Sequence, residues 1–119
     1  AFQRLVRKVP VSEPVLRHAV ALARATRPDP EAGEELDFVR RWVSYGASVR
    51  AAQYLTLGGK ARALTRGRTH VSFEDIRALA HPVLRHRVLL NFHAESERVT
   101  TDQVIDRLLE AVPAPSSGL

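Results

Sequence analysis

The sequence predicts a mainly α fold: a small helical bundle of about five helices, with one short extended segment allowed near residues 88–92. Three observations support this prediction. The chain has 119 residues, about one domain's worth, and 45% of them are hydrophobic, which is enough for one core. Apolar residues recur at helical spacing through most of the chain. Three segments also share one helix-start pattern.

The shared pattern is a valine, then a serine or threonine, then an apolar residue four positions after that hydroxyl residue. We expect the hydroxyl oxygen to accept a free N–H group of the first turn, while the two apolar side chains pack across it. Gln103 completes a capping box at the third start, and Asp75 gives a weaker one at the second. The three starts are Val11-Ser12 with Leu16, Val71-Ser72 with Ile76, and Val99-Thr100 with Val104.

The sequence predicts three helices in the N-terminal half of the chain. The first runs from residue 12 to about residue 27 and ends at a proline-containing loop, RPDPEAG. The second covers residues 34–45, and Gly46 is expected to end it in the left-handed conformation. The third runs from residue 49 to about residue 66, with Ser48 as its cap.

The C-terminal half predicts two further helices. One begins at Phe73, and Pro82 is expected to split it and to restart a short segment, PVLRHR, at the first position of that segment. The last helix covers residues 101–112 and buries one apolar face. Residues 1–113 are predicted to form the domain and residues 114–119 a flexible tail.

Composition excludes several classes of protein. The chain has no cysteine, so disulfides and thiolate metal sites are excluded. It has no apolar run near 18 residues, so no membrane span is expected, and its first residues lack the pattern of a signal peptide. It also has no methionine, even at residue 1, and we therefore expect a piece of a longer chain.

The chain is strongly basic, with a formal net charge of +5 and a pI near 10.7. All of its basic residues except Lys8 and Lys60 are arginines, and they are spread along the sequence. A solvated arginine-rich surface explains this composition. The alternative is a basic helical module that binds nucleic acid, which predicts that arginines gather on one face.

Gly58-Gly59-Lys60 looks like part of a phosphate-binding loop. Such a loop needs G-x-x-x-x-G-K-[ST] between a strand and a helix, but Tyr54 and Ala61 occupy its first and last positions here. We therefore expect the two glycines to pack against another helix. The five histidines lack the spacing of a zinc site, and no serine or acidic pair is a convincing catalytic group, so no metal ligand or catalytic residue is predicted.

Arg50 is the strongest candidate for a binding residue. If Ser48 caps the third helix, Arg50 lies in its first turn, where free N–H groups favour an anion. A guanidinium adds a planar set of donors that matches phosphate oxygens. An ordinary surface arginine is the alternative that the residues alone leave open.

Three segments of the chain carry motifs that one protein family combines. The first is VPVSEPVLRHAVALARATRP, with its closing A-T-R, and the last is VTTDQVIDRLLEAVP. Between them, YGASVRAAQYLTLGGKARALTRGRTHVSFEDIRALAHPVLRHRV carries the G-A-S-x-R-A start, K-A-R-A-L, the V-[ST]-x-E-D cap and P-V-L-R-H-R. Together these segments resemble the C-terminal helical lid of the MoxR family of AAA+ ATPases, the first being similar to the first lid helix and the last to the terminal helix. The chain departs from the family pattern at Val49, often proline there, and at Gly58-Gly59, where alanine-like residues are usual.

The resemblance implies an AAA+ lid-type bundle that closes over ATP and supplies one residue, the sensor-2 arginine, which corresponds to Arg50 with Ser48 as the helix cap. ATP and Mg²⁺ would be held by an N-terminal AAA+ core domain, so the isolated chain is not expected to be an enzyme although its parent would be an ATPase. The resemblance further implies a hexameric ring in the cytoplasm, chaperone-like activity in protein and metal-cofactor maturation, and partners with a von Willebrand factor A domain.

Overall fold

The structure is a computed structural model, and it describes residues 2–115. Within this range the chain forms eight α-helices, one 3₁₀ turn and one two-stranded sheet, which confirms the predicted mainly α class. The elements in chain order are α1 (Phe2–Lys8), α2 (Glu13–Ala25), η1 (Glu34–Leu36), α3 (Asp37–Trp42), β1 (Val43–Tyr45), α4 (Arg50–Thr65), α5 (Phe73–Ala78), α6 (Ala80–Leu84), β2 (Leu89–Leu90), α7 (Phe92–Ser96) and α8 (Thr101–Ala111).

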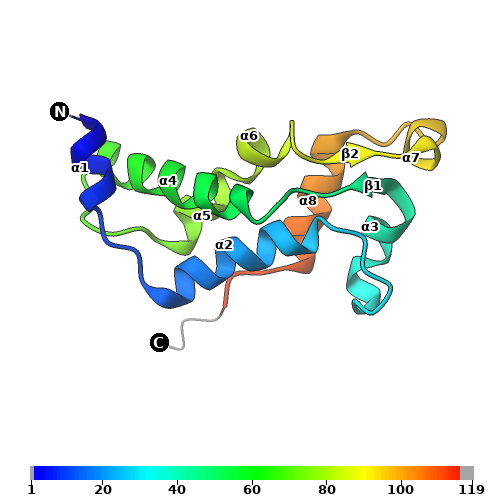
Figure 1. The fold of residues 1–119 in the computed structure, drawn as a ribbon, viewed down its shortest axis with the longest axis horizontal. Helices are drawn as coiled ribbons and strands as arrows, with labels where there is room; N and C mark the ends of the chain where they lie inside the picture. Colours follow the sequence, from blue (N-terminus) through cyan, green and yellow to red (C-terminus); the bar gives the residue numbers. More distant parts are fainter. Residues whose placement is uncertain (1, 116–119) are drawn as a thin grey trace.

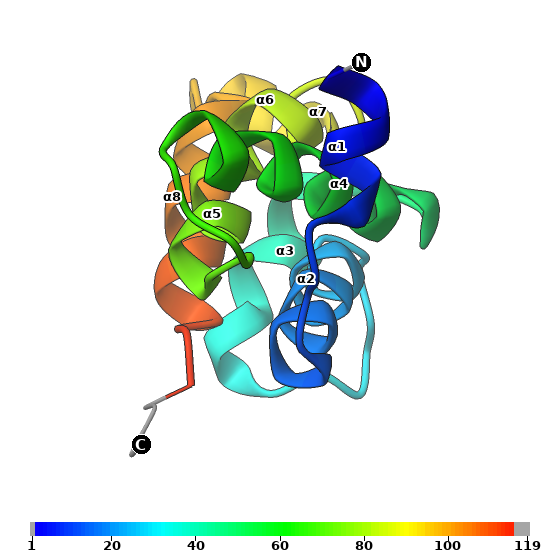
Figure 2. The same ribbon diagram turned by 90° about the vertical axis from the view of Figure 1, so that its left-hand side faces the viewer.

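The helices pack in two groups along an elongated molecule (Figure 1). At one end α2, α4 and α5 pack against one another, and α1 lies against α4. At the other end α3 and α7 lie beside the small sheet, while α8 packs against α6, α2 and α3 (Figure 2). The core joins both groups, and its largest fully buried apolar side chains are Leu22, Leu55, Ile76, Leu84, Ile105, Leu108 and Val39.

The predicted helices are present, but the second one is shorter than expected. It ends at Trp42, and Val43–Tyr45 leave the helix to pair antiparallel with β2. The amide of Asn91 also donates to the Trp42 carbonyl at 2.9 Å. The extended segment expected near residues 88–92 is therefore confirmed as β2. Its partner, β1, lies where the sequence predicted the end of the second helix.

The three predicted helix starts do not all behave alike. Ser72 and Thr100 form complete capping boxes, with Asp75 and Gln103 as the reciprocal residues. Ser12 precedes α2 but makes no side-chain hydrogen bond to it, so that part of the prediction is wrong. The helix that begins at Phe73 breaks at Leu79 rather than at Pro82, which is the third residue of α6.

Gly58 and Gly59 lie inside α4 and pack against α5, as the sequence predicted. A Cβ atom at Gly58 would lie 2.8 Å from the Leu79 side chain, and one at Gly59 would lie 3.1 Å from Ile76. The absence of side chains therefore lets the two helices approach closely. Of the predicted tail at residues 114–119, residues 116–119 lie outside the described residues.

Candidate functional site

The start of α4 presents Arg50 to solvent. The helix begins at Arg50 itself, so its N-cap residue is Val49, already helical at φ −56° and ψ −27°, rather than the expected Ser48. Ser48 still binds this turn, because its Oγ accepts the Arg50 amide N–H at 3.3 Å. Among the described residues, the Arg50 guanidinium has no ion pair or hydrogen bond.

The loop before Arg50 is fixed to the C-terminal end of α2. Thr26, which is 3% exposed, donates its hydroxyl to the Ala23 carbonyl at 2.6 Å and accepts the Ala47 N–H at 2.8 Å. A Cβ atom at Gly46 would overlap the Thr26 carbonyl and lie 2.6 Å from the Arg27 nitrogen. Gly46 is thus required for close backbone contact, and the prediction of a left-handed cap is wrong because its φ is not positive.

The position of Arg50 is electrostatically unusual. The N-terminus of a helix carries partial positive charge, so a cation in the first turn is disfavoured and an anion is favoured. Arg50 therefore does not stabilise α4, and it forms no ion pair within the described chain. A bound anion would relieve this repulsion and would accept hydrogen bonds from the guanidinium.

Apolar side chains next to Arg50 are also exposed. Tyr54 and Leu57 follow Arg50 at helical spacing and are 40% and 44% exposed, so this face of α4 is partly open to solvent. A groove of about 450 Å³ lies beside it, between α1, α2 and α4. Its lining residues are Arg7, Leu16, Val20, Val49, Ala52, Gln53, Thr56, Leu57 and Lys60.

Arginines near the start of α5 are, by contrast, used to build the fold. The buried Asp75 carboxylate accepts bonds from Arg62 at 2.6 Å, from Arg68, and from the Ser72 N–H at 2.9 Å. Burial alone would raise the pKa of Asp75, but the Ser72 and arginine contacts together hold that pKa below its usual value. Asp75 is therefore a structural carboxylate, ionised and paired.

Arg77 joins α5 to the end of α8. Its guanidinium donates to the Leu109 carbonyl and, at 2.6 Å, to the Val112 carbonyl, which are free at the end of that helix. It also lies 3.3 Å from Nε2 of the buried His18. Burial, and secondly the Arg77 charge, lower the pKa of His18, so this histidine is held neutral.

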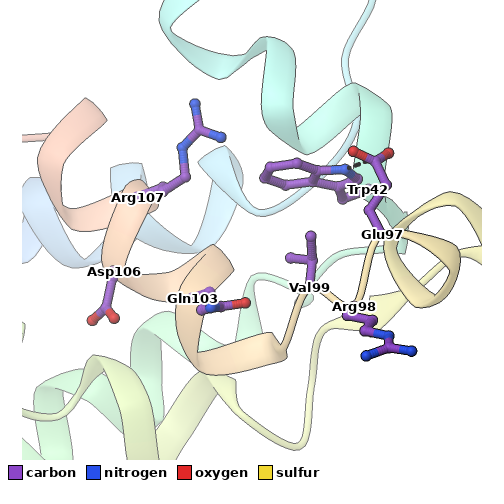
Figure 3. A pocket seen from close by; sticks show the side chains of 7 residues that line it. All are labelled: Trp42, Glu97, Arg98, Val99, Gln103, Asp106 and Arg107. Carbon is purple, nitrogen blue, oxygen red and sulfur yellow. Dashed lines mark hydrogen bonds between the residues drawn. The ribbon is translucent and has the colours of Figure 1, made fainter.

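A second cavity of about 460 Å³ lies at the opposite end of the molecule, between α3, α7 and α8 (Figure 3). Arg107 stacks 5.1 Å from the Trp42 ring centre, and the Trp42 indole N–H donates to Glu97 at 3.3 Å. Arg98 has a φ of 59°, the conformation that usually requires glycine after a helix. Glu97 also accepts hydrogen bonds from Arg41, so the side chains around this cavity mainly hold the three helices together.

The other candidate chemistries gain no support. No group of three or more His, Asp or Glu in residues 2–115 could hold a metal ion. The nucleic-acid alternative is not favoured, because six arginines in different parts of the described chain are paired with carboxylates. Over the same residues, none of the helices combines the length and apolarity needed to cross a membrane.

Sequence reasoning selected Arg50 but missed Thr26. The signal available was the A-T-R string at the end of the first predicted helix. A threonine at this position is typical of an ordinary helix end. Its partner, the Ala47 N–H, lies 21 residues later in the chain, so the local pattern does not show the contact. Only the packing of α2 against α4 brings the two segments together.

Comparison with protein families gives a match over residues 35–108 to the AAA lid domain. This range contains Arg50, the whole of α4 and most of α8, but not Thr26. The match therefore covers more than half of the chain and includes the candidate site.

Individual proteins point the same way. The chain is 32% identical over 105 residues to "Chaperone MoxR1" of Mycobacterium tuberculosis, covering 88% of this chain and 27% of that protein. It is 32% identical over 110 residues to "Protein MoxR" of Paracoccus denitrificans, covering 89% and 32%. A crystal structure of a "putative ATPase" from Cytophaga hutchinsonii superposes with a TM-score of 0.86 at 35% identity, covering 95% and 34%. The chain thus spans about a third of the length of these relatives.

Proposed function

The chain belongs to the AAA lid domain family and is a lid of the MoxR type, and on this premise we propose that it closes over ATP held by an N-terminal AAA+ core domain. Arg50 is, in this proposal, the sensor-2 arginine. Its guanidinium contacts the γ-phosphate in the closed state and distinguishes ATP from ADP. Ser48 supports it by binding the Arg50 amide.

One observation carries the proposal: an exposed arginine without a partner among the described residues stands at the N-terminal end of a helix. The helix dipole disfavours a cation there, and the side chain gains no compensating ion pair within the described chain. Residues that break a local electrostatic rule without visible compensation are typical of functional sites. A phosphate group would supply the missing compensation.

The residues of this chain fit a phosphate group but not a metal ion. The Arg50 guanidinium would hold phosphate oxygens, whereas the described residues offer no cluster of three metal ligands. We therefore assign Mg²⁺ and the catalytic groups to the core domain. ATP supplies the γ-phosphate whose transfer to water drives the cycle, and Arg50 holds that group while it is present.

The mechanism is a shift of the lid between open and closed positions. A nucleotide can shift this equilibrium only by the difference in its affinity for the two positions. One charge-assisted hydrogen bond supplies about 1.5–3 kcal/mol. When the γ-phosphate leaves, Arg50 loses this contact and closure is weakened by that amount.

The test is Arg50→Ala in the full-length protein, measured as ATP turnover and as affinity for a non-hydrolysable ATP analogue. We expect a loss of about tenfold or more in ATP-analogue affinity, because one charge-assisted contact is removed. Arg66→Ala is the matched control, since it removes the same charge from the exposed opposite end of α4. Wild-type affinity and turnover in Arg50→Ala would refute the sensor role.

We further propose that the whole protein is a chaperone-like AAA+ ATPase of the cytoplasm that acts as a hexameric ring in protein and metal-cofactor maturation, with von Willebrand factor A domain partners. The support is the likeness to MoxR proteins, one of which is named a chaperone. The isolated lid would not hydrolyse ATP by itself. Mass measurement of the full-length protein with an ATP analogue tests the ring, and a monomer at all concentrations would contradict it.

A further inference from the structure

Thr26 connects two segments that carry different parts of the fold. It follows the last residue of α2, and its hydroxyl makes two hydrogen bonds at once. The hydroxyl donates at 2.6 Å to the Ala23 carbonyl, which also accepts the Thr26 backbone N–H at 3.3 Å, and it accepts the Ala47 N–H at 2.8 Å. Thr26 and Ala47 are 3% and 1% exposed, so water does not readily replace either partner.

The contact is reinforced by Gly46. A Cβ atom there would overlap the Thr26 carbonyl, so the chain at Gly46 lies directly on the end of α2. The next residues form one continuous turn, in which the Ser48 carbonyl accepts from Ala51 at 2.9 Å and Ser48 Oγ accepts from Arg50. Ala51 is itself fully buried. The Arg50 backbone is thus held between two buried alanines.

We propose that Thr26 is a positioning residue for Arg50: its hydroxyl fixes the loop at Gly46-Ala47, and through that loop sets the direction of the Arg50 side chain. This inference rests on the proposed function of Arg50 as the γ-phosphate contact. It adds a residue from α2, outside the range of the family match, to the machinery that senses the nucleotide. Thr26 itself does not touch the nucleotide.

Loss of the hydroxyl has a definite structural consequence. Thr26→Val keeps the shape of the side chain but leaves the buried Ala47 N–H without its hydrogen-bond partner. The loop then moves toward solvent, because the Ala47 N–H can donate to water there. Such a movement displaces the start of α4, and the Arg50 side chain moves with it. Contacts at reacting phosphates depend steeply on displacements of about 1 Å.

A purely structural role and a positioning role predict different measurements. Weakened folding lowers the amount of active protein and affects ATP and ADP alike. Displacement of Arg50 lowers the preference for a γ-phosphate, which is the ratio of affinities for a non-hydrolysable ATP analogue and for ADP. This ratio is independent of the active fraction of the protein.

The experiment therefore compares Thr26→Val, Thr26→Ser, Arg50→Ala and the Thr26→Val/Arg50→Ala double variant in the full-length protein. We expect Thr26→Val to lower the affinity ratio by about three- to tenfold, the effect of one lost hydrogen bond. Thr26→Ser keeps the hydroxyl and should retain the wild-type ratio. In the Arg50→Ala background, Thr26→Val should cause no further change, because it acts through Arg50.

The outcomes separate the two proposals. If Arg50→Ala lowers the ratio but Thr26→Val does not, or if the two effects add, the positioning role is refuted and the sensor role of Arg50 stands. Failure of Thr26→Ser to restore the ratio also refutes positioning through the hydroxyl. If Arg50→Ala leaves the ratio unchanged, both proposals fail together.

Discussion

The starts of α4 and α5 use arginine in opposite ways. At α5, Arg62 and Arg68 converge on the fully buried Asp75, which also completes a capping box with Ser72. At α4, Arg50 stands in the first turn with its side chain exposed and with no carboxylate partner among residues 2–115. The one arrangement contributes to the stability of the fold, and the other does not.

This difference separates residues that the fold needs from a residue that only a ligand explains. A buried carboxylate is tolerated only with hydrogen-bonded partners, so Asp75 and its arginines depend on one another. An exposed arginine at a helix N-terminus can be removed without any such consequence. The contrast predicts opposite effects of substitution at the two starts, and four measurements test it.

The largest effect is expected for Asp75→Ala. The substitution leaves Arg62 and Arg68 without their shared carboxylate and removes one half of the capping box. We expect the free energy of unfolding in urea to fall by about 3–5 kcal/mol, the range for breaking a buried ion pair. Asp106→Ala, which removes an exposed carboxylate paired with His81, is the control and should change it by less than about 1 kcal/mol. A similar loss of unfolding free energy in both variants would show that the buried Asp75 pairs contribute no more than an exposed pair.

Gly46→Ala is expected to have the next largest effect. The new methyl group would meet the backbone of Thr26 and Arg27, which cannot move aside without shifting α2 from α4. Overpacking of this kind costs about 1–3 kcal/mol, measured by urea unfolding. Gly33→Ala is the matched control, because the three atoms nearest to its methyl group would all belong to the flexible Glu35 side chain. Equal stability of the two variants would show that the contact at Gly46 is not tight.

The pH dependence of stability tests the interior near α5. The folded-state pKa of His18 is lowered below its value of 6.5, so below that pH the unfolded chain binds a proton that the folded chain does not. Stability is therefore complete above about pH 6.5 and decreases as pH falls toward the folded-state pKa. His18→Gln should remove this part of the decrease between pH 7 and pH 5. Parallel curves for both proteins would mean that His18 is not buried in its neutral form.

The smallest effect on stability is expected for Arg50→Ala. Exposed substitutions usually change stability by less than about 0.5 kcal/mol. Here the sign should be neutral or slightly stabilising, because a cation is removed from the positive end of a helix. Thermal and urea unfolding of the variant test this value. A loss above 1 kcal/mol would mean that Arg50 has a structural partner, and the comparison with α5 would no longer hold.

Local pattern was sufficient for much of the molecule. The helices around α2, α4, α5 and α8 were predicted near their observed bounds, because an apolar face at helical spacing and a hydroxyl cap are properties of neighbouring residues. The capping boxes at Ser72 and Thr100 were predicted for the same reason. Arg50 was selected as a candidate from its expected place in a first helical turn and from the family resemblance.

The sequence by itself thus determined the helical class, the main caps and the choice of Arg50. Tertiary structure alone decided the conversion of Val43–Tyr45 into a strand, since its partner β2 is more than 40 residues away. It also decided that Gly46 serves a close contact rather than a left-handed turn, and that Thr26 holds the Ala47 amide. These features depend on which distant segments meet, and side-chain periodicity within one segment carries no information about that.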